Sequence, residues 1–243
     1  MKAKGVRFFR MINERIVSEL LAFWRAGVYR LKALMEGPKR SELGKESSNL
    51  IVFVHGYLAD SSCWRPWMQH LGHRGHQVAA VDLGLDHPLH TIDELADRLD
   101  LFLRQSTASY RDQLPKIHLV GHSMGGIVAA TYALRKDKGV KITSVVALAA
   151  PLKGAKLARA AKWVFSKCGQ EMAPESSLLK ELSAEFDQAD SATQFYYGAA
   201  QHDDLVPRDH VTLGGATPQV FPCNHMGIIY NNDARDLVET IVS

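Results

Sequence analysis

The sequence has few cysteines and no long uninterrupted apolar run. Cys63, Cys168 and Cys223 are its three cysteines, and no CxxC pair occurs. This count argues against a disulfide framework or a zinc knuckle and agrees with a reducing cytoplasm. In the first helical stretch the longest fully apolar piece is LLAFW, within a segment interrupted by Glu19 and Arg25. That piece is too short for a secretory signal or a membrane span, so we expect a cytoplasmic protein.

Motifs for cofactors are also missing. The sequence contains no GxxxxGK[ST] phosphate loop and no GxGxxG turn between a strand and a helix, so we expect no nucleotide cofactor. The stretch HLGHRGH holds His70, His73 and His76, but its two glycines prevent the histidines from sharing one rigid face. No carboxylate or cysteine within the stretch completes a ligand set, so we expect no metal.

Charge is distributed unevenly over the 243 residues. The formal net charge is +3, yet residues 1–50 hold 11 Lys and Arg against 5 Asp and Glu. A basic segment favours an anionic surface such as lipid or nucleic acid, and it is equally typical of a solvated helix. Because no other feature indicates nucleic-acid binding, we expect no nucleic-acid partner. The length and the 46% apolar content fit one α/β domain with an appendage.

The appendage is predicted to span residues 1–48. Apolar residues recur at helical spacing from Phe8 to Met35, and Gly37 and Pro38 end the helix before a polar linker. Three hypotheses for this amphipathic basic helix remain open. It packs on the domain, pairs with another subunit, or lies on the inner face of a membrane with its basic residues at the headgroups. The oligomeric state is left open with them.

Residues 49–243 alternate between short apolar runs and helical stretches. Several of the strands are nearly continuous apolar runs, which is typical of parallel strands buried on both faces. The alternation predicts a doubly wound, mostly parallel α/β sheet. The segment 152–192 interrupts the rhythm and is predicted to form a lid or cap. The predicted strands are 49–56, 77–84, 116–123, 142–151, 193–200 and 217–223, and the predicted helices are 61–75, 91–105, 124–136 and 226–242.

The stretch GHSMG matches the pattern GxSxG, with Ser123 between Gly121 and Gly125. It follows the apolar run IHLV and opens a helix rich in glycine and alanine, which is the strand–turn–helix setting of a nucleophile elbow. The alternative interpretation is a glycine-rich turn that only packs a helix close to a strand. In the elbow, small neighbours allow the sharp turn that exposes the serine hydroxyl.

A serine nucleophile needs a histidine base and a carboxylate that orients it. When the serine lies in a nucleophile elbow, the acid and then the histidine follow it along the chain. The histidines after Ser123 are His202, His210 and His225, and these are the candidates for the base. His225 follows the last predicted strand, where loops at the carboxyl ends of strands bind ligands, and it is the predicted base. Asp203 and Asp204 both follow a predicted strand, and either carboxylate could orient the imidazole.

Two backbone N–H groups are predicted to stabilise an oxyanion. One belongs to Met124, directly after the nucleophile, and the other to Tyr57, after the His55–Gly56 turn of the first predicted strand. The alternative interpretation of the stretch HGY (residues 55–57) is an ordinary glycine turn with no part in catalysis. We also predict that Leu58, Trp64, Trp67 and Leu152 line a substrate pocket.

These motifs occur in the order found in a known family. The stretches VFVHGYLADSSCW, HLVGHSMGGIVA, ALAAPLKGAKLA, HDDLVP and NHMGI resemble the α/β-hydrolase superfamily, in particular bacterial triacylglycerol lipases and related esterases, over about residues 49–242. The family's acid stands four residues before the proline of D-x-x-V-P. The resemblance therefore implies a triad of Ser123, Asp203 and His225.

The resemblance also has two departures. Related lipases have a Thr-Pro-His or similar sequence where this chain has the stretch 150–154, Ala-Pro-Leu-Lys-Gly. This difference weakens the inference to triacylglycerol substrates, although not to hydrolysis. Some relatives hold a structural calcium ion near the histidine loop. Here Asn231, Asn232 and Asp233 fit a polar turn at the last helix better, so we predict no calcium site.

The sequence as a whole predicts a serine hydrolase that cleaves carboxylic esters, either of small molecules or of lipids, through an acyl-enzyme. The same triad would serve an acyltransferase, a thioesterase or an amidase, and the sequence does not discriminate among them. A second alternative is a protein of the hydrolase fold that binds a lipid or a partner without turnover.

Overall fold

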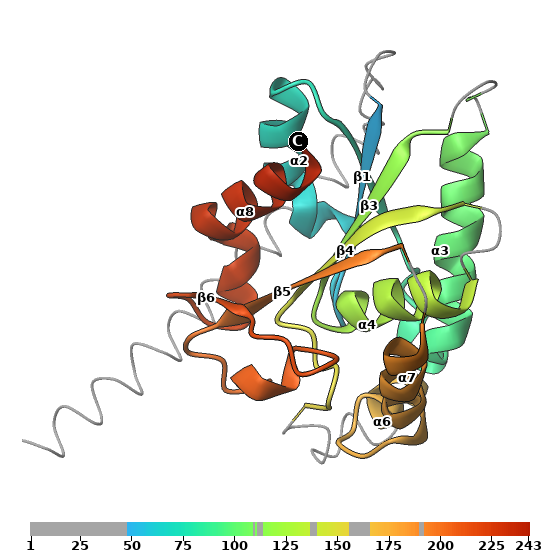
Figure 1. Cartoon of the computed structure of the whole chain (residues 1–243), viewed down its shortest axis with the longest axis vertical. Coiled ribbons are helices and arrows are strands. Elements are labelled where there is room, and N and C mark those ends of the chain that lie inside the picture. The colour runs from blue at the N-terminus through green and yellow to red at the C-terminus, as the bar shows by residue number, and fades with distance from the viewer. Residues whose placement is uncertain (1–47, 109, 111–113, 137–139, 156–165, 190–191) are drawn as a thin grey trace, which may run out of the picture.

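The fold is built on a twisted sheet of parallel strands (Figure 1). A computed structural model describes residues 48–108, 110, 114–136, 140–155, 166–189 and 192–243. Within these residues the sheet has six strands in the order β2-β1-β3-β4-β5-β6, and every neighbouring pair is parallel. The strands are β1 (Asn49–Val54), β2 (Gln77–Val81), β3 (Lys116–His122), β4 (Ile142–Leu148), β5 (Gln194–Ala200) and β6 (Gln219–Phe221).

Helices cover both faces of this sheet. Figure 1 shows α3 and α4 on one side and α2 and α8 on the other, which confirms the doubly wound fold expected from the sequence. The α-helices are α2 (Arg65–His73), α3 (Ile92–Thr107), α4 (Met124–Thr131), α6 (Lys167–Glu171), α7 (Ser177–Gln188) and α8 (Asn232–Val242). The shorter helical segments are η1 (Ser61–Trp64), η2 (His87–Leu89), η3 (Tyr132–Lys136), η5 (Arg208–His210) and η6 (Met226–Tyr230).

Strand β1 shows why both faces of the sheet must be covered. Its side chains alternate between the two faces, as they do in every β-strand. Leu50 and Val52 enter the core under α3 and α4, whereas Ile51 and Phe53 enter the core under α2 and α8, and all four are buried. A nearly continuous apolar strand therefore belongs inside the molecule, with helices on both sides.

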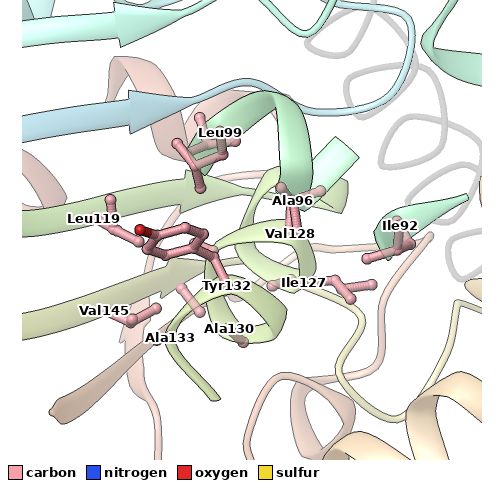
Figure 2. Close-up of a cluster of buried hydrophobic side chains, with 14 of the residues drawn as sticks. Ile92, Ala96, Leu99, Leu119, Ile127, Val128, Ala130, Tyr132, Ala133 and Val145 are labelled. Atoms are coloured by element: carbon pink, nitrogen blue, oxygen red, sulfur yellow. The ribbon is translucent and has the colours of Figure 1, made fainter. Parts of the chain in front are cut away.

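Helix α4 is the most deeply buried helix described. All eight of its residues are buried between the sheet and α3. Figure 2 shows Val128 of α4 beside Ala96 of α3 in this core. At the π-helical turn η3 that continues α4, the Tyr132 hydroxyl donates a hydrogen bond of 3.1 Å to Asp100 Oδ1. Burial on all sides fixes α4, and with it the residue that precedes it.

Helix starts follow their capping residues. Thr91 and Glu94 form the capping box of α3, in which each side chain accepts a hydrogen bond from the other residue's backbone N–H. The predicted helix 61–75 begins instead with the turn η1, which Asp60 caps by accepting from the Ser62 N–H. The predicted helix 226–242 is divided into η6 and α8, because the Asn231 side chain caps a new start by accepting from the Ala234 N–H.

The segment 152–192 contributes α6 and α7 beside α3 (Figure 1). The Glu171 carboxylate accepts from the Ile92 N–H at 2.6 Å, and Arg135 binds Glu185 of α7 at 2.7 Å. Residues 156–165 lie outside the described part, and so does the predicted helix of residues 1–47. The lid function of 152–192 and the contacts of the basic N-terminal helix therefore stay predictions. Among the described helices, none combines the length and the apolar character needed to cross a membrane.

Candidate active site

Ser123 occupies a sharp turn between β3 and α4. Its backbone has φ 53° and ψ −124°, which L-residues seldom adopt and which costs on the order of 1–3 kcal/mol. The Ser123 N–H donates to the Leu148 carbonyl of β4 at 2.9 Å, so the turn is tied to the neighbouring strand. Strain of this kind persists only where the surrounding structure holds it, here β4 on one side and the buried α4 on the other.

The glycines of the motif are required by close backbone approach. A Cβ atom on Gly121 would lie 2.5 Å from the Gly126 nitrogen, and a Cβ atom on Gly125 would lie 2.6 Å from the His55 carbonyl oxygen. Any side chain at these positions would push α4 away from β3 and β1. The GxSxG pattern is therefore a packing requirement of the turn that presents Ser123.

A chain of hydrogen bonds runs from this serine to an aspartate. Ser123 Oγ lies 3.0 Å from His225 Nε2, and His225 Nδ1 lies 2.8 Å from Asp203 Oδ2. A carboxylate only accepts hydrogen bonds, so Nδ1 carries the imidazole proton and Nε2 is free to accept the serine proton. This is the arrangement that a hydroxyl, a base and an orienting acid require.

The structure places Asp203, and not Asp204, beside the histidine. Asp203 Oδ1 accepts the N–H groups of Leu205 and Val206, both at 2.9 Å, which leaves Oδ2 for His225. The Asp203 side chain is 3% exposed, whereas Asp204 is exposed. The loop after β5 thus forms a tight turn that aims one carboxylate oxygen at the base.

The other two candidate histidines make different contacts. His202 is exposed, and its backbone N–H donates to the Cys223 carbonyl at 3.0 Å. His210 donates from Nδ1 to the Gly154 carbonyl at 2.7 Å. Of the three candidate histidines, His225 is therefore the one that the structure brings to Ser123. The contacts of His202 and His210 are made with other parts of the backbone.

His122 has a contact that the sequence did not indicate. In the pattern GxSxG, His122 occupies the first variable position, which carries no predicted role. Its Nε2–H donates to the His225 carbonyl at 3.0 Å, and the two rings lie 4.9 Å apart. Burial, and then the neighbouring His225, lower the pKa of His122 to about 3. A neutral His122 therefore holds the backbone of His225, the proposed base. In the sequence, the feature that could have indicated this contact is a polar residue at the end of an apolar, buried strand.

The loop after β1 lies directly against the nucleophile. A Cβ atom on Gly56 would be 3.1 Å from both Ser123 Cβ and His122 Nδ1, so only glycine allows this approach without displacement. Tyr57, the next residue, is half-buried against the core, and Met124 is the first residue of α4. The first N–H groups of a helix have no intrahelical partner and point outward from its start. Both predicted oxyanion donors thus belong to backbone segments beside Ser123.

The four residues predicted to line a pocket separate into different environments. Leu58 is 68% exposed on the β1 loop, and Leu152 is buried in the core under α3 and α4. The prediction for Trp64 and Trp67 needs correction, because both are core residues under α2 and α8. Trp64 stacks on Phe53 at 4.9 Å between ring centroids, and Trp67 Nε1–H donates to the Ile229 carbonyl at 2.5 Å. The helical spacing of two large apolar side chains places both toward the sheet.

His70 has carboxylates nearby that the local sequence did not reveal. Asp236 and Glu239 of α8 bring ligand atoms within 4.8 Å of one another and of a His70 ring nitrogen. Arg74 Nε binds Glu239, and Arg235 binds Asp236 at 3.1 Å. Two guanidinium groups already neutralise these carboxylates, so the cluster is an ion-pair network that joins α2 to α8.

The parallel sheet, with a strained serine between β3 and α4, defines the class of α/β-hydrolase folds. A model of the alpha/beta hydrolase family matches residues 51–236. This range covers most of the chain and contains Ser123, Asp203 and His225. The chain therefore belongs to the alpha/beta hydrolase family.

Parts of the chain are similar to two proteins of Arabidopsis thaliana. The probable lysophospholipase BODYGUARD 4 is 30% identical over an alignment of 108 positions that covers 42% of this chain and 25% of that protein. Methylesterase 7 is 33% identical over an alignment of 94 positions that covers 37% of this chain and 36% of that protein. The chain matches well under half the length of each of these relatives.

The fold also resembles that of a solved bacterial enzyme. The lipase BlEst2 of Bacillus licheniformis, in its mature form, superposes with a TM-score of 0.67 at 20% sequence identity. The superposition covers 79% of this chain and 91% of that chain. At this identity the likeness establishes the common fold alone.

Proposed function

We propose that this protein is a serine hydrolase that cleaves carboxylic esters through an acyl-enzyme. The observation that carries the proposal is the hydrogen-bonded chain from Ser123 Oγ through His225 to Asp203, with contacts of 3.0 and 2.8 Å. The strained backbone at Ser123 supports it, because such strain concentrates at functional positions. A turn that only packs a helix on a strand would not need a buried base and acid beside it.

Acylation begins when Ser123 Oγ attacks the ester carbonyl carbon and its proton passes to His225 Nε2. The imidazolium that forms is stabilised by Asp203, which accepts the Nδ1–H. The carbonyl π electrons move onto oxygen and give a tetrahedral oxyanion. When the C–O bond to the alcohol breaks, His225 returns the proton to the departing alkoxide, and the acyl group stays on Ser123.

The oxyanion is stabilised by the N–H groups of Tyr57 and Met124 in this proposal. Donors of this type typically lower the barrier by about 3 kcal/mol each, because they act on charge that develops in the transition state. Deacylation repeats the steps with water as the nucleophile and His225 as the base. The products are a carboxylic acid, an alcohol and the free Ser123 hydroxyl.

We propose esters with an apolar acyl chain, including lipids, as the substrate class. Relatives named as a lysophospholipase and a lipase support this choice. Leu58, exposed on the loop beside Ser123, is the side chain proposed to contact the acyl chain. The proposal includes no cofactor or metal, because the serine, histidine and aspartate supply every group that ester hydrolysis requires.

The direct test is the hydrolysis of p-nitrophenyl esters from C2 to C16 by the full chain and by Ser123→Ala. Turnover in the wild type and its loss by at least about a thousandfold in the variant are expected. Ser177→Ala, at an exposed position in α7, is the matched control and should match the wild type. No turnover of any ester, together with no labelling of Ser123 by a fluorophosphonate, would rule out the proposal.

A competing alcohol in the same assay identifies the acceptor. Release of free acid as the main product agrees with hydrolysis, whereas transfer of the acyl group to the alcohol at the expense of acid would assign an acyltransferase. The chain-length profile then separates preference for short esters from preference for long ones.

A further inference from the structure

The loop that carries Tyr57 is held at its next residue by a histidine from another part of the chain. Leu58 has φ 57°, a left-handed conformation that is unfavourable for a branched side chain, and this side chain is 68% exposed. Packing therefore does little to keep Leu58 in place. Its N–H donates to His87 Nε2 at 3.0 Å.

His87 is itself fixed on several sides. Its Nδ1–H donates to the Gly84 carbonyl at 2.7 Å, and its own carbonyl accepts from Cys168 Sγ of α6 at 3.6 Å. His87 is 2% exposed, although nothing in its sequence surroundings marks it. It therefore joins three segments: the β1 loop, the loop after β2 and the start of α6.

The hydrogen bonds of His87 determine its protonation state. Nε2 accepts from a backbone N–H and Nδ1 donates to a carbonyl, so the imidazole is neutral with its proton on Nδ1. Burial lowers the pKa of His87 and favours this form. The charged groups that face it are Asp82 and Asp86, which raise the pKa, and Arg98, which lowers it. Protonation of Nε2 would turn the acceptor into a donor and break the contact with Leu58.

The same imidazole also contacts the side chain of Tyr57. The two rings meet edge to face with 5.7 Å between their centroids. His87 therefore holds residue 57 at two places, through its aromatic ring and through the peptide that follows it. The N–H proposed to bind the oxyanion belongs to this same residue, on the other side of its Cα atom from the Leu58 peptide.

We propose that His87 is a positioning residue. Through the Leu58 N–H it holds the loop after β1 so that the Tyr57 N–H points toward the oxyanion. The inference rests on the proposed function, because an oxyanion donor matters only if Ser123 attacks a carbonyl. Oxyanion donors act only when they are already aimed at the charge that develops. Loss of the His87 contact should therefore lower kcat and leave KM nearly unchanged when both are measured with p-nitrophenyl acetate, whose acyl group lacks the chain proposed to contact Leu58.

Two substitutions separate the two hydrogen bonds of His87. In His87→Gln, the amide oxygen can occupy the position of Nε2 and still accept from Leu58, while the contact with Gly84 is lost. In His87→Asn, the amide nitrogen can occupy the position of Nδ1 and still donate to Gly84, while the contact with Leu58 is lost. Each variant removes one buried hydrogen bond, so we expect similar losses of stability in thermal unfolding.

Activity should distinguish the two variants. We expect His87→Asn to lose kcat by about 10- to 100-fold and His87→Gln to stay within about threefold of the wild type, with KM nearly constant in both. His90→Gln is the local control, because His90 follows η2 but pairs with Asp86 and Glu94 at the surface. Equal kcat values in the Asn and Gln variants, whether both high or both low, would overturn the inference.

Hydrogen exchange of the Leu58 amide gives a measurement that does not depend on turnover. Protection in the wild type and in His87→Gln, but not in His87→Asn, is expected. An unprotected Leu58 amide in the wild type would overturn the inference while leaving ester hydrolysis intact. A protected amide in a wild type that cleaves no ester would overturn the proposed function and, with it, the part assigned to His87 in turnover.

Discussion

His122 Nε2 lies 3.0 Å from the backbone carbonyl oxygen of His225, so the residue before the nucleophile also holds the base. The two residues are 103 positions apart in the chain. The end of β3 therefore leads into Ser123 and also holds the backbone of His225, which positions the imidazole relative to the serine hydroxyl. This coupling explains why a polar side chain is kept at the end of an otherwise apolar buried strand.

Removing the His122 donor should impair catalysis and stability together. In His122→Leu the buried carbonyl of His225 loses its partner, which we expect to cost about 1–3 kcal/mol in the free energy of unfolding and at least about tenfold in kcat. His122→Gln keeps an N–H near the Nε2 position and should recover most of both. Urea unfolding and ester kinetics on the two variants test this, and equal behaviour of Leu, Gln and wild type would contradict it.

The two adjacent aspartates should differ sharply in their effect on turnover. Asp203→Asn cannot stabilise the imidazolium and can favour the wrong tautomer of His225, so we expect kcat to fall by about 10³- to 10⁴-fold. Asp204→Asn changes an exposed carboxylate and should stay within about twofold of the wild type. Steady-state kinetics decide the matter, and a comparable loss in both variants would contradict the assignment of Asp203.

The strain at Ser123 should appear as a reversed order of alanine and glycine. Glycine adopts φ 53° without a Cβ clash, so we expect Ser123→Gly to be more stable than Ser123→Ala by about 1 kcal/mol, after its larger unfolded-state entropy is subtracted. At Ser183 in the middle of α7, where the backbone is helical, alanine should be more stable than glycine by about 0.5–1 kcal/mol. Urea unfolding of the four variants gives the comparison, and the same order at both positions would show that Ser123 is unstrained.

Two buried histidines of β3 should make the fold sensitive to acid. Burial lowers the pKa of His118 to about 4 and that of His122 to about 3, against about 6.5 in an unfolded chain. Between pH 6.5 and these values the unfolded state binds protons that the native state does not. Stability is therefore complete above about pH 6.5 and falls as the pH decreases, by up to about 1.4 kcal/mol per pH unit for each histidine.

His118→Gln provides the measurement for this effect away from the catalytic serine. His118 binds Ser144 Oγ through Nδ1 at 2.8 Å near the start of β3, whereas Ser123 follows its end. We expect the variant to have a shallower loss of unfolding free energy between pH 7 and 5, with unchanged kcat at neutral pH. An unaltered pH dependence would show that His118 is protonated equally in both states.

The sequence was sufficient for features that depend on local spacing. Continuous apolar strands and the glycines around Ser123 each follow from contacts between neighbouring residues or from the geometry of one turn. His225 was also predictable, because its place after the last predicted strand puts it at the carboxyl edge of a parallel sheet. The family resemblance added the choice of Asp203.

Other features depend on contacts between distant segments, and spacing does not encode them. The residues alone left Asp203 and Asp204 equivalent, because the turn that aims Oδ2 is formed by backbone N–H groups. The contacts of His122 and His87 cross between loops and have no motif. Trp64 was misplaced because a large aromatic residue near a site motif fits a pocket wall and a core equally well until the sheet face is known.

The wholly buried helix α4 has a consequence for how the protein loses activity. Ser123 is attached to the innermost helix and strand, whereas His225 and Asp203 come from connections after β6 and β5 at the edge of the sheet. Local opening is easiest at such peripheral connections and hardest in a closed interior. Under mild denaturant the loops that carry His225 and Asp203 should open and break the contacts with Ser123, while β3 and α4 remain folded. Inactivation would then precede the loss of helical signal, and dilution of the denaturant would restore catalysis without refolding of the whole chain.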